Sequence, residues 1–578
     1  MDRREVARIL EDIAAMLELK GENPFKVRAY ENGARAVLGF GGDLDEAVRT
    51  GALRSVRGIG AGLFSNIKTL VETGALPYHA ELRAAFPPGL RECLRIPGFG
   101  ARKAKQLHQA IGIDSLAALE KACQDGRVAG VKGFGPRSAE KILKSIAVMR
   151  ASSGYHLYHR ARARAEDAVA ALQGLAENLE IAGSLRRRCE VIRDIDLVAT
   201  AREPAALASA FRELPGVTEV TADGPTKVSV RFHDGLAADL RVVAPEEFPA
   251  ALLYFTGSKE HNTALRGRAR RMGLKLNEYG LYAVDGEGPV PCASEADIYR
   301  ALGLAYIEPE LREGRGEIEA AERGELPVLV QASDLRGLIH VHTTESDGRA
   351  SLEEMVSVMR QSGYGYVAIT DHSQTATYAG GLTPDRVRAQ REEIRALRRR
   401  LPDFRIFHGT EADILADGSI DYGDDFLPIF DVVVASVHSR FGLSREEQTQ
   451  RLIRAVRNPF VSVLGHPTGR LLLSREPIAV DAEAVIDAAA ESGCAIEMNC
   501  NPHRLDLDWR LGRRAIERGV LIAIDPDAHS VREIELVPYG IGIARKGWVT
   551  PKATLNALSA SELERWLTAR RGVPLAEP

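Results

Sequence analysis

The chain has 578 residues, 45% hydrophobic and 27% charged, a composition typical of globular proteins and a length that suits several domains. No apolar run approaches the ~18 residues of a membrane span, so we expect no membrane partner. The start MDRREVARILEDI predicts a charged helix rather than a signal peptide, and the six cysteines form no CxxC pair, which together indicate a cytoplasmic protein with reduced thiols.

The net charge of −4 is unevenly distributed along the chain. Residues 1–150 contain 24 Lys and Arg against 17 Asp and Glu, whereas the rest contains 52 against 63. A basic front suggests a region that binds a polyanion. A modest excess of basic residues is also typical of an ordinary solvated surface, so the charge distribution alone does not identify a binding region.

Residues 1–150 are expected to be all-helical, and we divide them into 1–80 and 81–150. Three segments place two glycines around one residue, with a helix pattern after them: VRGIGAGLFSNI, IPGFGARKAKQL and VKGFGPRSAEKI. Such a turn leaves backbone N–H groups at a helix N-terminus, where they bind phosphate without reading base sequence. One copy is common in helical turns, but three favour contact with a DNA backbone. The glycines are Gly58, Gly60, Gly98, Gly100, Gly133 and Gly135, and the pattern resembles the helix-hairpin-helix motif of DNA-binding proteins.

From residue 151 the pattern changes to strands mixed with helices, and we expect an α+β core at 151–250. Asp194 and Asp196 lie two apart in a predicted strand, so both carboxylates project from one face. Asp239 can join them from a neighbouring strand. A D-x-D pair at a strand end is often merely solvated, but three converging carboxylates suit Mg²⁺ or Mn²⁺ and nucleotidyl transfer.

After a small α+β segment at 251–318 and a linker at 319–335, residues 336–572 alternate strand and helix patterns, which predicts an α/β barrel. Five segments place His or Asp where a strand should end: LIHVHT, VAITDHS, VVVASVHS, VSVLGHP and LIAIDPDAH. Catalytic groups gather at that end of barrel strands. One such His is more often simply packed or hydrogen-bonded, but the repetition favours a metal site. The candidate ligands are His340, His342, Asp347, His372, Glu411, His438, His466, Asp527 and His529.

Imidazole and carboxylate ligands suit Zn, Mn or Fe rather than Ca. Nine candidates are too many for one ion, so we expect two or three. A site with several metal ions is typical of phosphoester hydrolysis, because the ions can stabilise both the attacking and the leaving oxygen.

The motif order over 1–318 resembles family X DNA polymerases, the DNA polymerase beta family. GSLRRRCEVIRDIDL resembles the family's nucleotidyltransferase site, YFTGSKEHNTALR its nucleotide pocket and LNEYGL its template-side loop. NPFKVRAYENGARA resembles the single-strand-binding domain of bacterial members. The resemblance implies three catalytic carboxylates, eight nucleotide contacts and two further DNA contacts. These are, in that order, Asp194, Asp196 and Asp239; Gly183, Ser184, Arg187, Tyr254, Phe255, Gly257, Asn262 and Arg266; and Lys26 and Tyr30.

Two positions depart from the family pattern. Asn66 stands where relatives with lyase activity have a Schiff-base lysine, and an amide cannot form that imine. Lys68 is nearby, but two residues along a helix turn it ~200° away. We therefore expect weak or absent 5′-deoxyribose-phosphate lyase activity. Arg193 stands where the family often has Gly, which alters the close backbone approach at that position.

The C-terminal pattern HVHT…SDG…TDHS…GTEAD…SVHS…GHP…DAH resembles the polymerase and histidinol phosphatase (PHP) domain, which bacterial family X polymerases carry at this end. The resemblance covers 337–570 and makes the nine candidates its metal ligands, for Mn²⁺, Zn²⁺ or both. It implies 3′–5′ exonuclease and related 3′-end or abasic-site cleavage. Pro526 stands where Ser is common and is expected only to stiffen the turn. His503 and Arg504 are candidate phosphate contacts, and a structural salt bridge is an equal alternative.

Three readings follow from these patterns. The first is a monomeric DNA repair enzyme that fills short gaps in gapped or primed DNA with deoxynucleoside triphosphates and trims 3′ ends. Its fold would be multidomain: an all-α helix-hairpin-helix region, an α+β nucleotidyltransferase core and a distorted α/β barrel. The second is a phosphatase of small phosphoesters with a DNA-binding appendage. The third is a non-catalytic DNA-end scaffold with structural zinc, although structural zinc sites are usually Cys-rich.

Overall fold

The computed structural model describes residues 3–38, 40, 44–56, 58–94, 96, 99–284 and 288–575. The chain divides into two compact units, residues 1–153 with 473–475, and residues 154–472 with 476–578. Among the described residues, no helix combines the length and apolar content that a membrane crossing requires.

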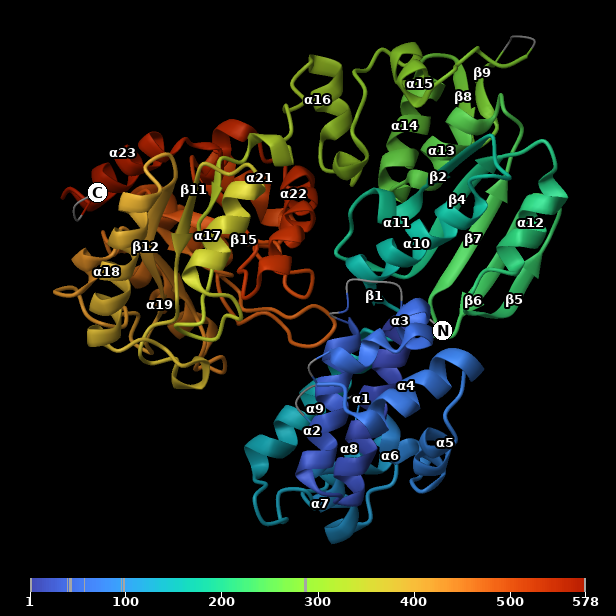
Figure 1. The fold of residues 1–578 in the computed structure, drawn as a ribbon. Coiled ribbons are helices and arrows are strands. Elements are labelled where there is room, and N and C mark those ends of the chain that lie inside the picture. The colour runs from blue at the N-terminus through green and yellow to red at the C-terminus, as the bar shows by residue number, and fades with distance from the viewer. Residues whose placement is uncertain are drawn as a thin grey trace. The chain divides into compact units, whose positions relative to one another are not determined.

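The first unit is all-helical, as predicted (Figure 1). Amphipathic helices bury one stripe each, and these stripes form two apolar clusters, one centred on Leu10 and Ile67 and the other on Phe99 and Leu119. Its helices are α1 (Arg3–Lys20), α2 (Pro24–Leu38), α3 (Leu44–Thr50), η1 (Ala52–Ser55), α4 (Ala61–Thr73), α5 (Pro77–Ala84), α6 (Pro88–Cys93), α7 (Ala101–Ile111), α8 (Leu116–Gln124) and α9 (Pro136–Ala151).

The second unit begins with a five-stranded sheet of order β2-β4-β7-β6-β5. Only β4 and β7 are parallel in it; the other neighbours are antiparallel. Alternate residues of β7 are buried, as expected for a sheet with one covered face. The elements are β1 (His156–Leu157), α10 (Tyr158–Leu172), β2 (Asn178–Ile181), α11 (Gly183–Arg186), β3 (Val191–Ile192), β4 (Asp194–Thr200), α12 (Pro204–Arg212), β5 (Val217–Asp223), β6 (Lys227–Phe232) and β7 (Ala237–Val242).

A smaller α+β segment follows, joined to α11 by a buried charge network. Glu295 accepts two hydrogen bonds from Arg186, at 2.9 and 2.6 Å, and one from the fully buried Arg312 at 2.7 Å. The elements are α13 (Phe248–Thr256), α14 (Lys259–Arg271), β8 (Leu274–Asn277), β9 (Gly280–Ala283), α15 (Glu295–Ala301), η2 (Pro309–Leu311), α16 (Glu317–Arg323) and η3 (Ala332–Asp334).

The rest of the second unit is a seven-stranded parallel sheet whose strands run in chain order, β10 to β16. A parallel bridge between Val341 and Ala528 joins the segments after its first and last strands, so the sheet is a nearly closed barrel. The predicted α/β barrel is thereby confirmed. The strands are β10 (Gly337–Leu338), β11 (Tyr366–Ile369), β12 (Arg405–Asp413), β13 (Val432–Ser436), β14 (Val463–Leu464), β15 (Ala495–Asn499) and β16 (Ile522–Asp525).

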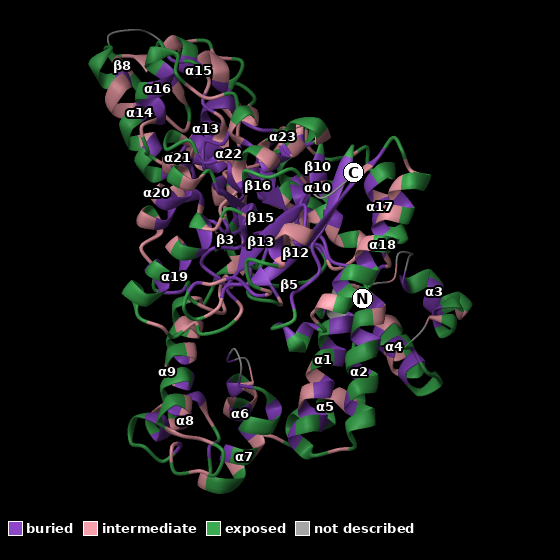
Figure 2. Cartoon of the chain, turned by 90° about the vertical axis from the view of Figure 1, so that its left-hand side faces the viewer, coloured by how far each residue is buried: buried purple, intermediate pink, exposed green. Residues whose placement is uncertain are grey.

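Helices surround these strands, which are buried along their length (Figure 2). Strands covered on both faces need continuous apolar runs, and this explains sequences such as Val432–Ser436. The helices are α17 (Leu352–Gln361), η4 (Thr377–Ala379), α18 (Pro384–Arg400), η5 (Leu427–Ile429), α19 (Arg445–Arg457), α20 (Ala482–Ser492), α21 (Trp509–Glu517), η6 (Val531–Leu536), α22 (Val537–Lys546), η7 (Pro551–Ala553), η8 (Leu555–Ala557) and α23 (Ala560–Arg571).

Polar bonds connect the α+β core to the barrel within the second unit. The indole of Trp509 donates to Glu190 at 2.9 Å, and Arg510 pairs with the same carboxylate at 2.8 Å. The buried Lys546, at the end of α22, donates to the backbone oxygen of Arg187 at 3.0 Å and to the carboxylate of Glu313. A buried charge that loses its partner is costly, so these bonds fix how the two parts pack.

Candidate functional sites

The first candidate site lies on the parallel strands β4 and β7. Asp194 and Asp196 share one face of β4, and the register pairs Asp196 directly with Asp239. The three carboxylates therefore lie close together on two adjacent inner strands of the sheet. Lys227, at the start of β6, pairs with Asp239 at 2.5 Å. The sequence pattern did not single out this lysine, which directly precedes Val228 at the start of β6.

The electrostatics of this site favour a bound cation. Burial, with the charges of Asp194 and Asp239, raises the pKa of Asp196 to about 7. Burial and the charge of Asp239 also raise the pKa of Asp194. Carboxylates that disfavour each other's ionised forms are stabilised when positive charge enters between them. The donor set is oxygen only, which suits Mg²⁺ or Mn²⁺.

The predicted triphosphate contacts lie at the short helix α11. Gly183 has a φ of 64°, and a Cβ there would meet Asp196 Oδ2 at 2.1 Å, so only glycine fits. Ser184 follows it in α11. Arg187 donates from Nε to Glu313 at 2.9 Å and from Nη1 to the backbone oxygen of Thr256. The guanidinium of Arg187 is thus held in place from two sides.

The other predicted nucleotide contacts cluster around the end of α13. Tyr254, Asn262 and Arg266 line one small cavity, and Asn262 donates to the backbone oxygen of Tyr254 at 2.7 Å. The ring of Phe255 lies edge-on to that of Tyr254 and beneath the guanidinium of Arg241, 4.3 Å away. Gly257 has a φ of 71°, and a Cβ there would meet Arg187 Nη1 at 3.0 Å.

The second candidate site is the His and carboxylate cluster of the barrel. The described residues contain three groups of side chains, and within each group the ligand atoms all lie within 4.8 Å of one another. They are His342, Asp347, His372 and His529; His340, His342, Glu411 and Asp527; and His372, Glu411 and His438. His466 joins them through Nε2, 2.9 Å from Glu411 Oε1. All nine predicted ligands are therefore brought together, although they come from segments spread over 190 residues of sequence.

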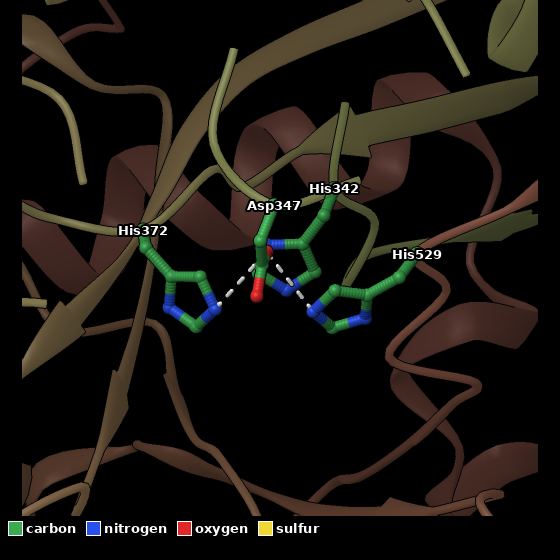
Figure 3. Close-up of side chains that lie close together, drawn as sticks. All are labelled: His342, Asp347, His372 and His529. Carbon is green, nitrogen blue, oxygen red and sulfur yellow. Dashed lines mark ion pairs between the residues drawn. The ribbon is translucent and has the colours of Figure 1, made fainter. Parts of the chain in front are cut away.

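Figure 3 shows the most open of these groups. Asp347 lies between two imidazoles, 3.5 Å from His372 Nε2 and 3.2 Å from His529 Nε2. The side chains of Asp347 and His529 are 36% and 29% exposed, whereas His340, His342 and Glu411 are fully buried. A substrate can therefore reach the cluster on the side of Asp347 and His529.

Carboxylates behind the cluster orient its histidines. Glu497 Oε1 lies 2.6 Å from His340 Nδ1, and Asp413 Oδ1 lies 2.7 Å from His438 Nδ1. Each contact leaves Nε2 turned to the cluster, which is how metal-binding histidines are usually held. The sequence reading missed both carboxylates. Asp413 lies two residues after Glu411, on the same face of β12, and Glu497 lies in the middle of β15, but neither position carries a local signal that separates it from other strand carboxylates.

The cluster fits divalent cations. Four buried ligand atoms have no hydrogen-bond partner: His340 Nε2, His342 Nε2, Glu411 Oε2 and Asp527 Oδ1. Buried polar atoms in proteins are usually hydrogen-bonded. Burial alone would raise the pKa of Glu411, but the imidazoles of His438, His372 and His340 hold that pKa well below its usual value. Asp527 adopts a φ of 52° after Pro526, and strained backbone of this kind is frequent at functional sites.

The two candidate phosphate contacts near the cluster differ in position. Arg504 Nε lies 4.0 Å from Asp527 Oδ2, with its side chain 21% exposed, so its guanidinium is near the ligand atoms. The ring of His503 lies 5.2 Å from that of His159, and burial lowers the pKa of His503.

In the first unit the hairpin glycines begin helices. Gly60, Gly100 and Gly135 are the N-caps of α4, α7 and α9, while Gly98 lies outside the described residues. Gly58 and Gly133 have φ values of 100° and 87°, where a side chain would be strained. A cavity of about 190 Å³ lies at the second and third hairpins, lined by several basic and polar groups: Arg102, Lys103, Gln106, Ser138, Lys141 and Ser145.

The predicted single-strand contacts are less open. Tyr30 is buried, and its hydroxyl accepts from Asn66 at 2.8 Å. The ammonium of Lys26 lies 5.2 Å from the ring centroid of Tyr78 and 3.9 Å from Glu22.

Arg193, at the other departure from the family pattern, lies 5.7 Å from the ring centroid of Tyr155.

Comparison with known proteins gives matches along the whole chain. Three family models match: a helix-hairpin-helix domain at 1–76, a SAM-like helix-hairpin-helix tandem at 90–147 and the DNA polymerase beta thumb at 251–313. The DNA polymerase/3′-5′ exonuclease PolX of Bacillus subtilis (strain 168) is 37% identical over 574 residues, 98% of this chain and 99% of that protein.

Shorter relatives match the C-terminal region. A probable phosphatase of Thermoanaerobacter sp. (strain X514) is 25% identical over 228 residues, 38% of this chain and 88% of that protein. A probable phosphatase of Caldicellulosiruptor bescii is 30% identical over 211 residues, 34% of this chain and 80% of that protein.

Proposed function

Because this chain belongs to the family X DNA polymerases, we propose that it fills short gaps during DNA repair and processes 3′ ends at a second, separate site. The chain is a DNA polymerase with an associated 3′–5′ exonuclease domain. The observation that carries the proposal is that both clusters are complete: three carboxylates on β4 and β7, and nine ligand residues in the barrel. We further propose that it acts as a monomer in the cytoplasm.

Nucleotidyl transfer is assigned to Asp194, Asp196 and Asp239. These residues would hold two Mg²⁺ or Mn²⁺ ions, which supply charge neutralisation for the attacking 3′-oxygen and the leaving pyrophosphate. Lys227 keeps Asp239 oriented through their ion pair. Gly183, Ser184 and Arg187 would bind the triphosphate, and Tyr254, Phe255 and Gly257 would limit the space at the sugar. Asn262 and Arg266 would face the new base pair.

Hydrolysis at 3′ ends is assigned to the barrel cluster. Its ligands would hold two or three ions, Mn²⁺, Zn²⁺ or both, which supply Lewis-acid activation of water and of the phosphate. Glu497 and Asp413 fix the orientation of His340 and His438. Arg504, whose Nε lies 4.0 Å from Asp527 Oδ2, would bind a phosphate oxygen. The helix N-termini after the hairpin glycines would bind the DNA backbone, so that affinity falls steeply with salt.

A primer-extension assay tests both assignments. An end-labelled primer on a one-nucleotide gap is incubated with Mn²⁺, with and without the complementary nucleotide. Wild type should extend the primer by one nucleotide when the complementary nucleotide is present, and should shorten the primer when that nucleotide is absent. Asp239→Asn should only shorten the primer, and His372→Ala should only extend it. If neither substitution removes one activity selectively, the assignment of two separate sites is wrong.

The phosphatase names of the shorter relatives favour one alternative, a barrel that hydrolyses small phosphoesters. Turnover of a sugar phosphate and of a DNA 3′ end should be compared on the same preparation. We expect the DNA end to be the better substrate by kcat/KM, because the helix-hairpin-helix region adds phosphate contacts that a small ester cannot use.

A further inference from the structure

One tyrosine stands at the rim of the barrel cluster with its ring in solvent. Tyr378, in η4, is 71% exposed. Its ring centroid lies 6.3 Å from that of His372 and 6.4 Å from that of His438. Other barrel aromatics, such as Tyr366, Phe407 and Phe430, are almost fully buried. The ring of Tyr378 therefore contributes little to the core, although it lies beside two predicted metal ligands.

The backbone that carries this ring is well fixed. The N–H of Ala376 donates to Ser373 at 3.0 Å, and that of Gly381 donates to Ala376 at 3.1 Å. Arg386 donates from Nη1 to the backbone oxygen of Gly380 at 2.8 Å. Ala376 and Ala379 are buried on either side of the exposed ring. An aromatic ring held in advance on a fixed turn loses little entropy when a ligand binds to it.

His372 connects Tyr378 to the open side of the cluster. Its ring centroid lies 6.3 Å from that of Tyr378, and its Nε2 lies 3.5 Å from Asp347 Oδ1. Asp347 is also one of the two exposed ligands. The exposed ring and the open side of the cluster therefore adjoin, and a bound substrate would meet both.

We propose that Tyr378 forms a stacking subsite for the base of the 3′-terminal nucleotide while its phosphodiester lies at the barrel cluster. The ligand class is thus a nucleobase, and the inference rests on the proposed 3′-end hydrolysis. Every base offers a π-face, so such a contact tolerates all sequences, as a general end-trimming site requires. A small phosphoester has no base and would gain nothing from this ring.

The test uses two single strands that differ only at the 3′-terminal residue, a normal thymidine or a tetrahydrofuran residue without a base. Full-length wild type, Tyr378→Ala, Tyr378→Phe and His372→Ala are compared for removal of that residue in Mn²⁺. Tyr378→Ala should lower kcat/KM on the thymidine end roughly 5- to 100-fold, the range of base stacking on an aromatic ring. The same variant should change removal of the base-free residue by less than about twofold. Tyr378→Phe keeps the π-face and should match wild type on both ends.

The outcomes separate this inference from the function on which it rests. If Tyr378→Ala lowers removal of both residues equally, the side chain has only a structural role, and the stacking subsite is refuted. The same conclusion follows if Tyr378→Ala behaves as wild type on both strands. If wild type shortens neither strand, or His372→Ala shortens both at the wild-type rate, the proposed 3′-end hydrolysis itself fails, and the subsite fails with it.

Discussion

Single residues of this protein show how burial controls charge. His408, in β12, is almost fully buried, and burial together with the charges of Arg391 and Arg398 lowers its pKa to about 3. In the unfolded chain His408 has an ordinary histidine pKa of about 6.5. Between about pH 6.5 and about pH 3, the unfolded chain therefore binds a proton at His408, whereas the folded protein does not. The free energy of unfolding should therefore fall as the pH drops from about 6.5 towards 3.

Replacing His408 with Gln should flatten this pH dependence. The wild type should lose up to about 1.4 kcal/mol of stability per pH unit from His408 across this window, and the variant should lose less. Urea unfolding at several pH values would measure it through tryptophan fluorescence, since Trp509, Trp548 and Trp566 all lie in the barrel region. Stability at pH 8 gives the cost of the substitution itself. If the free energy of unfolding depends on pH equally in wild type and His408→Gln, His408 is not the source of this pH dependence.

The contacts of Asn66 and Lys68 lead to a prediction about lyase activity. Its amide donates to Tyr30, and Lys68 pairs with Glu72 at 3.6 Å on an exposed face of α4. Borohydride trapping on DNA with a 5′-deoxyribose phosphate should therefore yield little covalent adduct with wild type. A strong adduct that disappears in Lys68→Ala, but not in Lys141→Ala, would show that Lys68 replaces the expected lysine.

At the scale of elements, strand ends determine the barrel site. The strand-then-turn segments were predictable because a β-branched run followed by His or Asp is a local signal, and the parallel order of β10 to β16 brings those ends together. Glu497 and Asp413 were not predicted, because a carboxylate behind a ligand differs from any other strand carboxylate only in its tertiary contacts. The same holds for Lys227, whose partner Asp239 lies on the neighbouring strand.

The supporting carboxylates should affect metal affinity more than chemistry. Glu497→Gln weakens the contact that orients His340, so the Mn²⁺ concentration for half-maximal 3′–5′ exonuclease activity should rise roughly 10- to 100-fold. Nucleotide addition should stay unchanged. Glu446→Gln, at an exposed position of α19, is the matched control. Equal metal requirements for the two variants would exclude an orienting role for Glu497.

Metal removal should destabilise the barrel itself. Without cations, buried atoms such as His342 Nε2 and Glu411 Oε2 have no hydrogen-bond partner, so ions that bind only the folded state stabilise it by mass action. Chelation with EDTA should lower the unfolding temperature followed by tryptophan fluorescence, and Mn²⁺ should restore it. A transition that does not respond to either treatment would argue against ions in this cluster.

At the scale of the whole molecule, buried polar bonds within the second unit connect the α+β core, which holds one candidate site, to the barrel, which holds the other. Lys546 comes from the barrel, yet it donates to the backbone oxygen of Arg187 and shares Glu313 with the Arg187 guanidinium. No sequence pattern predicts the contact of Lys546 with Arg187 and Glu313, because a lysine in the last turn of a helix usually caps the helix or faces solvent. The fold class, and which His and carboxylate residues cluster in the barrel, were thus predictable from local patterns, whereas the contacts between the α+β core and the barrel were not.

Removing the Lys546 ammonium should therefore weaken nucleotide use at a distance. Lys546→Met leaves Arg187 without this support, and we expect kcat/KM for nucleotide addition to fall roughly 10- to 100-fold, as for the loss of one charged hydrogen bond. Exonuclease activity should be nearly unchanged. Lys552→Met, at an exposed position of η7, is the control. A parallel loss of both activities would instead indicate general destabilisation of the second unit.

The bridge between Val341 and Ala528 has a consequence for how the protein matures. His340 and His342 flank Val341, and Asp527 and His529 flank Ala528, so ligands from the two ends of the barrel meet only after nearly all of it has been synthesised. Contacts this distant in sequence form late, because the intervening loop must close first. A nascent chain therefore cannot assemble the complete ligand cluster before its last strand docks, and the 3′-end hydrolysis proposed for this cluster should begin only once synthesis of the barrel is almost finished.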